Sequence, residues 1–157
     1  MVAGLVAVLL AGSLTACTSS TQSYCSALKD DRARLKQLSA DSAKPGSSAL
    51  SDSVTVLSEL RDKAPDDISG EWDTLVNALQ DLVDAVKATG AHLSDFRSGK
   101  KPAGVSSGQF RAVQQAAEEL SSTRVQQAGA SIEQHAQDVC KVDLGGGLGT
   151  GGAGGTG

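Results

Sequence analysis

The residues that usually carry chemistry are few in this chain and do not form a recognisable site. Its two histidines, His92 and His135, are far apart, and no H-E-x-x-H, E-x-x-H or C-x-x-C motif supplies metal ligands around them. Neighbouring acids such as Asp66 and Asp67 project about 100° apart from a helix, so a solvated face or a helix start suits them better than acid–base chemistry. We therefore predict that the protein is not an enzyme and holds no metal ion or cofactor.

A pattern in the Gly-rich C-terminal run matches a cofactor motif only in its letters. Gly147 to Gly152 (GLGTGG) fits the dinucleotide fingerprint G-x-G-x-x-G. That motif works between a strand and a helix whose N-terminus faces a pyrophosphate, and the five residues after Gly152 cannot build such a helix. The sequence instead predicts a polar tether at residues 17–23, one domain at 24–143 and a disordered tail at 144–157.

The N-terminal residues form an uncharged apolar run from Val2 to Ala16, which fits a secretory signal better than a membrane-spanning helix of about 20 residues. The run leads into Leu14-Thr15-Ala16-Cys17, which resembles the lipobox of bacterial lipoproteins. In that family the cysteine thiol is acylated, for example with palmitate, and the signal is cut just before it. The resemblance implies a signal peptide at residues 1–16, lipidation of Cys17, and anchoring to the extracytoplasmic face of the cell membrane. An ordinary signal peptide is the alternative.

The number of cysteines is odd, and three thiols would leave one unpaired in an exported protein. Lipidation of Cys17, as the resemblance implies, leaves Cys25 and Cys140. Export places these two in an oxidising compartment, where a disulfide is expected. Closing a loop of this length reduces the entropy of the unfolded chain, which stabilises the fold by on the order of 4 to 5 kcal/mol. Two unpaired buried thiols are the alternative.

The domain shows helical periodicity and no alternating β-branched runs that would indicate strands. Helices are predicted over about residues 22–40, 47–63 and 106–141, and a third one starts at Pro65. This third helix has the strongest periodicity, with apolar residues every three or four positions: Ile68, Trp72, Leu75, Leu79, Leu82 and Val86.

Two features leave the helix boundaries open. Gly90 suits a helix end, yet the apolar rhythm continues, so the third helix either ends there or runs on to Arg97. In the fourth helix the apolar stripe slips by one residue between Leu120 and Val125, and we expect a bend at Gly129.

Four helices joined by short breaks favour an up-down-up-down four-helix bundle. In that topology the start of the first helix and the end of the last lie at the same end of the bundle, where Cys25 and Cys140 would meet. The predicted fold class is therefore all-α, with a disulfide joining the first and last helices. Trp72 should lie near the same end and anchor the core.

The first two predicted helices are shorter than the last two, so the tip of the second hairpin is expected to protrude. The apolar residues at this tip would then be covered only by one another, and they form a candidate interaction site: Leu93, Phe96, Phe110 and Val113. The alternative is that residues 91–97 fold back and cap the bundle.

Composition narrows the function classes. The formal net charge of −4 leaves no basic face for nucleic acid, and the four aromatic residues are too few for base-stacking platforms.

The chain up to about Cys140 resembles small secreted helical lipoproteins of actinobacteria. The resemblance rests on the lipobox, the cysteine pair and the Ala-, Gly- and Asp-rich composition. That resemblance implies location and fold, and no activity. We predict a membrane-tethered module that binds another envelope protein; the alternative is a carrier of an apolar ligand, lipid or haem, between the helices.

Overall fold

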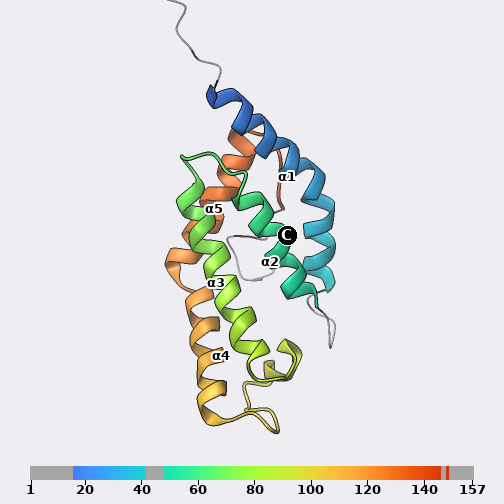
Figure 1. Ribbon diagram of the computed structural model, residues 1–157, viewed down its shortest axis with the longest axis vertical. Coiled ribbons are helices and arrows are strands. Elements are labelled where there is room, and N and C mark those ends of the chain that lie inside the picture. The colour runs from blue at the N-terminus through green and yellow to red at the C-terminus, as the bar shows by residue number, and fades with distance from the viewer. Residues whose placement is uncertain (1–15, 42–47, 146–147, 149–157) are drawn as a thin grey trace, which may run out of the picture.

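The protein is built from helices. The computed structural model describes residues 16–41, 48–145 and 148, except for the side chains of residues 16–19 and 39. Within this part of the chain no strand occurs, so the all-α fold class is confirmed. The elements are α1 (Ala16–Asp41), α2 (Ala49–Arg61), α3 (Ser69–Lys87), the 3₁₀ helix η1 (Leu93–Phe96), α4 (Ser107–Leu120) and α5 (Thr123–Asp138) (Figure 1).

Helix α3 is the centre of the packing. It contacts α2, which in turn contacts α1, and it also contacts both α4 and α5, which follow each other along one side of α3 (Figure 1). A helix that is covered from several sides needs a wide apolar stripe. This explains why the periodicity of α3 is the strongest in the sequence: its buried residues are Trp72, Leu75, Val76, Ala78, Leu82, Val83 and Val86.

The last predicted helix is in fact two helices, which corrects the prediction of one helix over residues 106–141. Helix α4 ends at Leu120, and α5 begins after Ser122, whose Oγ accepts a hydrogen bond from the backbone N–H of Val125 (3.4 Å). Ser122 therefore caps a new helix. The break explains the slip in the apolar stripe. The interruption therefore lies before α5, whereas Gly129, where we expect a bend, lies within α5 and is buried.

The third helix stops before Gly90, so the alternative in which it continues to Arg97 is wrong. Helix α3 ends at Lys87, and Gly90 has a φ of +70°, which a residue with a Cβ atom rarely adopts. The chain then turns back into η1. This short helix is stabilised at its start by the backbone N–H of His92, which donates to Asp95 Oδ2 at 2.9 Å.

Both ends of the domain differ from the sequence expectation. Helix α1 begins at Ala16, so residues 17–23, predicted as a tether, form its first turns, and no proline or glycine interrupts them. At the other end Leu144 and Leu148, predicted in a disordered tail, pack against the core, and the backbone N–H of Leu148 donates to Glu133 Oε1 (2.6 Å). The remainder of the predicted signal and tail lies outside the described residues: 1–15, 146–147 and 149–157.

Two apolar clusters hold the helices together. The larger one lies between α1, α2, α3 and α5, and its largest fully buried side chains are Trp72, Tyr24, Leu28, Leu60, Ile132, Val56, Val76 and Val125. The smaller one, Leu82, Val86 and Val113, joins α3 to α4. Full burial of each large aliphatic side chain contributes roughly 1.5 to 3 kcal/mol to folding, so the larger cluster dominates the stability of the domain.

Candidate functional site

A disulfide joins α1 to the segment that follows α5. The Cα atoms of Cys25 and Cys140 are 5.0 Å apart, and the predicted pairing is confirmed. Directly after Cys140 the chain reverses, because Lys141 adopts a φ of +55° and the backbone N–H of Val142 donates to the carbonyl oxygen of Ala136 at 2.9 Å. The reversal buries Val142, so the disulfide lies where both ends of the domain meet the core.

Tyr24, next to Cys25 in the chain, fills the core together with Trp72. Both side chains are fully buried, and their rings meet edge to face with centroids 6.2 Å apart. The Trp72 Nε1–H donates to Tyr24 Oη at 2.9 Å, so these two buried polar atoms satisfy each other. The prediction that Trp72 anchors the core near the disulfide is confirmed. The hydrogen bond to Tyr24 is not predicted, because no short sequence pattern connects residues 48 positions apart.

The Tyr24 hydroxyl is a weak acid in this environment. Burial raises the pKa of Tyr24 from 10.0 to about 12, because the phenolate would lose its hydration in the core. The hydrogen bond from Trp72 lowers the pKa of Tyr24, and the charge of Asp67 raises it. Because the hydroxyl stays protonated near neutral pH and lies away from solvent, it is unsuited to act as a general base or a nucleophile.

His135 lies against Tyr24 and meets one of the acids at the start of α3. Its Nε2 is 3.5 Å from Asp67 Oδ2, and its ring centroid is 5.7 Å from that of Tyr24. The side chain is 11% exposed, and Nδ1 is buried without a hydrogen-bond partner among the described residues. His135 therefore has one ring nitrogen near a carboxylate and one without a partner among the described residues. An Asp–His pair can activate a hydroxyl, but the neighbouring Tyr24 hydroxyl is buried and bound by Trp72, so it is not available to this pair.

A nucleophile-elbow pattern is also present, and the structure gives it another role. Residues 104–108 (GVSSG) match G-x-S-x-G, in which the serine sits between a strand and a helix. Here a loop precedes the serine, and Ser106 is the N-cap of α4. Its Oγ accepts from the backbone N–H of Gln109 (3.2 Å), while Gln109 Oε1 accepts from the backbone N–H of Ser106 (2.9 Å). The pattern is therefore a capping box.

The predicted interaction tip comes together in space; it consists of Leu93, Phe96, Phe110 and Val113. The rings of Phe96 and Phe110 stack with centroids 6.2 Å apart, and Val113 belongs to the smaller core cluster, against which Leu93 and Phe96 pack. Val113 is 3% exposed and the other three residues are half-buried. The tip reaches beyond α1 (Figure 1). Because η1 carries Leu93 and Phe96 back against Phe110 and the smaller cluster, none of these four residues is exposed, and the predicted exposed apolar knob is absent from the described residues.

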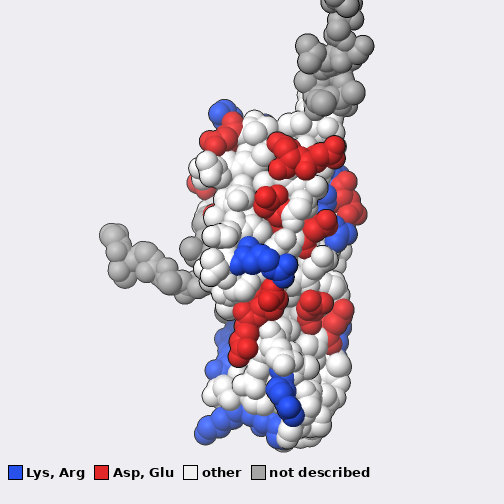
Figure 2. Space-filling model, turned by 90° about the vertical axis from the view of Figure 1, so that its left-hand side faces the viewer, with Lys and Arg blue, Asp and Glu red and all other residues white. Residues whose placement is uncertain are grey.

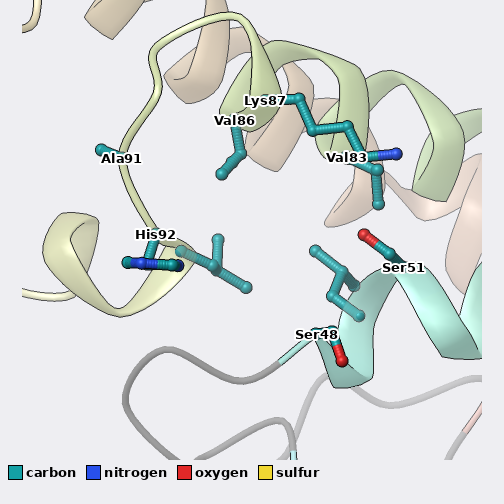
Figure 3. A pocket seen from close by; sticks show the side chains of 9 residues that line it. Ser48, Ser51, Val83, Val86, Lys87, Ala91 and His92 are labelled. Carbon is teal, nitrogen blue, oxygen red and sulfur yellow. The ribbon is translucent and has the colours of Figure 1, made fainter.

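A surface cavity of about 180 Å³ lies between α2, α3 and the loop before η1. Figure 3 shows residues of its lining: Ser48, the N-cap of α2, and Ser51 of α2, Val83, Val86 and Lys87 of α3, and Ala91 and His92 of the loop. Typical pockets for small ligands have volumes of roughly 300 to 1,000 Å³. The cavity therefore has room for a small group and not for a haem.

The predicted lipidation site lies at the N-terminal limit of the residues that the structure describes. Leu14 and Thr15 lie outside the described residues, and Cys17 lies in the first turn of α1 with its side chain outside the description. In the described ranges, no helix is long and apolar enough to cross a membrane. Among those same residues, no three His, Cys, Asp or Glu side chains are placed to hold a metal ion.

Comparison with known proteins gives no match. No protein family, curated protein or solved structure corresponds to this chain. The function must therefore be inferred from the chain's own residues.

Proposed function

We propose that the protein is a lipid-anchored, non-enzymatic helical module of the cell envelope that binds another envelope protein. The observation that carries this proposal is the Cys25–Cys140 disulfide, because structural disulfides persist in oxidising compartments outside the cytoplasm. The lipobox-like sequence Leu14 to Cys17 provides the anchor, since two acyl chains suffice for stable membrane attachment.

The scaffold that we infer is an up-down-up-down bundle in which α4 and α5 together take the place of the fourth helix. Four helix pairs support it: α1 packs on α2, α2 packs on α3, and α3 packs on both α4 and α5. The disulfide between α1 and the end of α5 fits the same topology, because it needs the first and last helices to meet at one end.

A binding module is favoured over a carrier because the space between the helices is filled. Trp72, Tyr24, Leu28 and Ile132 are fully buried where α1, α3 and α5 meet, which leaves the surface as the place for contact. One observation favours the carrier: the cavity beside Val86 could take a small apolar group. We place the contact region of the module at the end formed by residues 91–113, which reaches beyond α1 (Figure 1).

The anchor is tested by expressing the full chain in a bacterial host that receives alkyne-labelled palmitate. The wild-type protein should carry the label and sediment with the membranes. Cys17→Ser should lose the label and appear in the soluble fraction, whereas Cys25→Ser, the matched control, should keep it. Label on the Cys17→Ser variant, or none on the wild type, contradicts the anchor.

The choice between module and carrier is tested on protein purified from native membranes. A carrier should retain a small molecule in a fixed ratio to the protein, which mass spectrometry of an organic extract would reveal. The module should yield none, and chemical crosslinking in intact cells should join it to a second protein. Stoichiometric ligand without any crosslinked protein would reverse the proposal.

A further inference from the structure

The end of the molecule formed by residues 91–113, which includes the tip, carries mainly basic charged side chains on its surface. Its aromatic rings are half-buried against each other, whereas the side chains of Lys100, Lys101 and Arg111 are exposed. Residues 93–111 contain four basic side chains and one acid, a formal charge of +3, in a chain whose total is −4. Basic side chains therefore outnumber acidic ones at this end of the molecule, although the whole chain is acidic.

Figure 2 shows how the charges are distributed on one face of the protein: both signs occur in its middle and upper parts. Blue side chains gather at the lower end, where Figure 1 places the turn between η1 and α4, and the red side chains of that face lie above them. This end is the one farther from the start of α1 (Figure 1). A cluster of one sign attracts opposite charges over roughly a Debye length, about 10 Å at moderate salt. The tip therefore favours an anionic partner.

The backbone that carries these cations is held in place. The loop turns at Gly99 and Gly104, which have φ values of +68° and +80°, and Lys101 Nζ donates to the carbonyl oxygen of Val105 at 2.6 Å. Gln109 Nε2 donates to the carbonyl oxygen of Ala88 (2.7 Å), which joins the start of α4 to the end of α3. Because the loop is ordered before binding, little further entropy is lost when a partner docks.

We propose that the basic side chains beside the tip, Lys100, Lys101 and Arg111, bind an acidic segment of a protein partner. The inference rests on the proposed function, which makes the partner a protein. Nucleic acid is disfavoured because the one large apolar side chain that is exposed among the described residues is Val139, so no aromatic ring is free for base stacking. A membrane surface is disfavoured because the tip presents no exposed apolar anchor beside its cations.

Binding to simple polyanions tests the charge chemistry directly. The probes are poly-L-glutamate and vesicles of phosphatidylglycerol, and the protein is the full chain with its disulfide intact. Lys100→Glu/Lys101→Glu should weaken binding to poly-L-glutamate roughly tenfold, since two attractions become repulsions, and added salt should weaken the wild type. The matched control is Lys29→Glu/Lys36→Glu, two exposed lysines of α1 that should matter much less. Equal losses for both variants, no binding, or binding to the vesicles alone would overturn the proposal.

Carbodiimide crosslinking in intact cells tests the contact itself, because this reagent joins an amine to a carboxylate with loss of water and adds no spacer. Mass mapping should find Lys100 or Lys101 linked to an Asp- or Glu-rich peptide of another protein, and that link should vanish in Lys100→Glu/Lys101→Glu. A partner linked only through Lys29 or Lys36 would contradict binding at the tip but would agree with the proposed function as a binding module. If no second protein is crosslinked anywhere on the chain, the proposed function itself fails.

Discussion

Ionisation of the buried Tyr24 should destabilise the protein at alkaline pH. The pKa of Tyr24 is 10.0 when the chain is unfolded and is raised by burial to about 12 in the folded protein. Between these two values the unfolded state binds fewer protons than the folded state, so the free energy of unfolding falls as pH rises. A shift of about two pKa units corresponds to a loss of about 2 to 3 kcal/mol by the time pH reaches 12.

The assay is urea unfolding, followed through the fluorescence of the single Trp72, at a series of pH values from neutral to about pH 12. Tyr24→Phe is the matched variant: it keeps the ring and removes the titrating hydroxyl. It should be less stable at neutral pH by about 1 to 3 kcal/mol, because the Trp72 Nε1–H loses its acceptor. Above pH 10 the difference from the wild type should shrink, because only the wild type loses this contribution.

A direct titration can refute the reasoning. Because Tyr24 is the one tyrosine of the chain, tyrosinate absorbance reports on it alone. In the folded protein the absorbance should rise near pH 12, or in step with alkaline unfolding. A rise near pH 10 in protein that is still folded would show that the hydroxyl is hydrated, and the packing around Trp72 would then be wrong.

Three further perturbations follow from the packing and the caps. Reduction of the disulfide should lower the free energy of unfolding by on the order of 4 to 5 kcal/mol, measured by urea denaturation with and without reductant; no change would mean that the loop closure contributes nothing. Ser122→Ala should cost about 1 kcal/mol because it removes the N-cap of α5, whereas Ser121→Ala should cost less, and thermal melts of the two should differ in that order. Ile132→Ala should cost about 2 to 5 kcal/mol in the same assay and Val139→Ala close to nothing, because Ile132 is fully buried and Val139 is 47% exposed; similar losses would contradict the register of α5.

The helices could be predicted from the sequence because helix formation depends on the spacing of residues that are close together in the chain. Apolar residues recurring every three or four positions placed α2 and α3 within a few residues of their observed bounds. The pairing of Cys25 with Cys140 was also predicted, since lipidation of Cys17 would leave no other pair. The start of α1 was placed too late, because a polar helical turn without proline or glycine looks the same as a spacer in the sequence.

The site could be predicted less well, because its contacts join residues that are far apart along the chain. Nothing near Tyr24 in the sequence indicates that its hydroxyl would accept from Trp72, or that His135 would approach Asp67. The tip shows the same limit: the sequence places the apolar residues Phe96 and Phe110 near each other, but only the fold shows that η1 turns back so that the two rings stack.

The sequence by itself determined the helical class and the apolar faces, because both depend on residue type and short spacing, and it indicated the disulfide partners because lipidation of Cys17 would leave only Cys25 and Cys140. Only the tertiary structure decided which surface is available for contact. The excess of basic residues over residues 93–111 is visible in the sequence, but only the fold places this segment at one end of the molecule, with Lys100 and Lys101 on the loop before α4 and Arg111 in α4. Local periodicity sets which way a side chain faces on its own helix, whereas packing sets what lies opposite it.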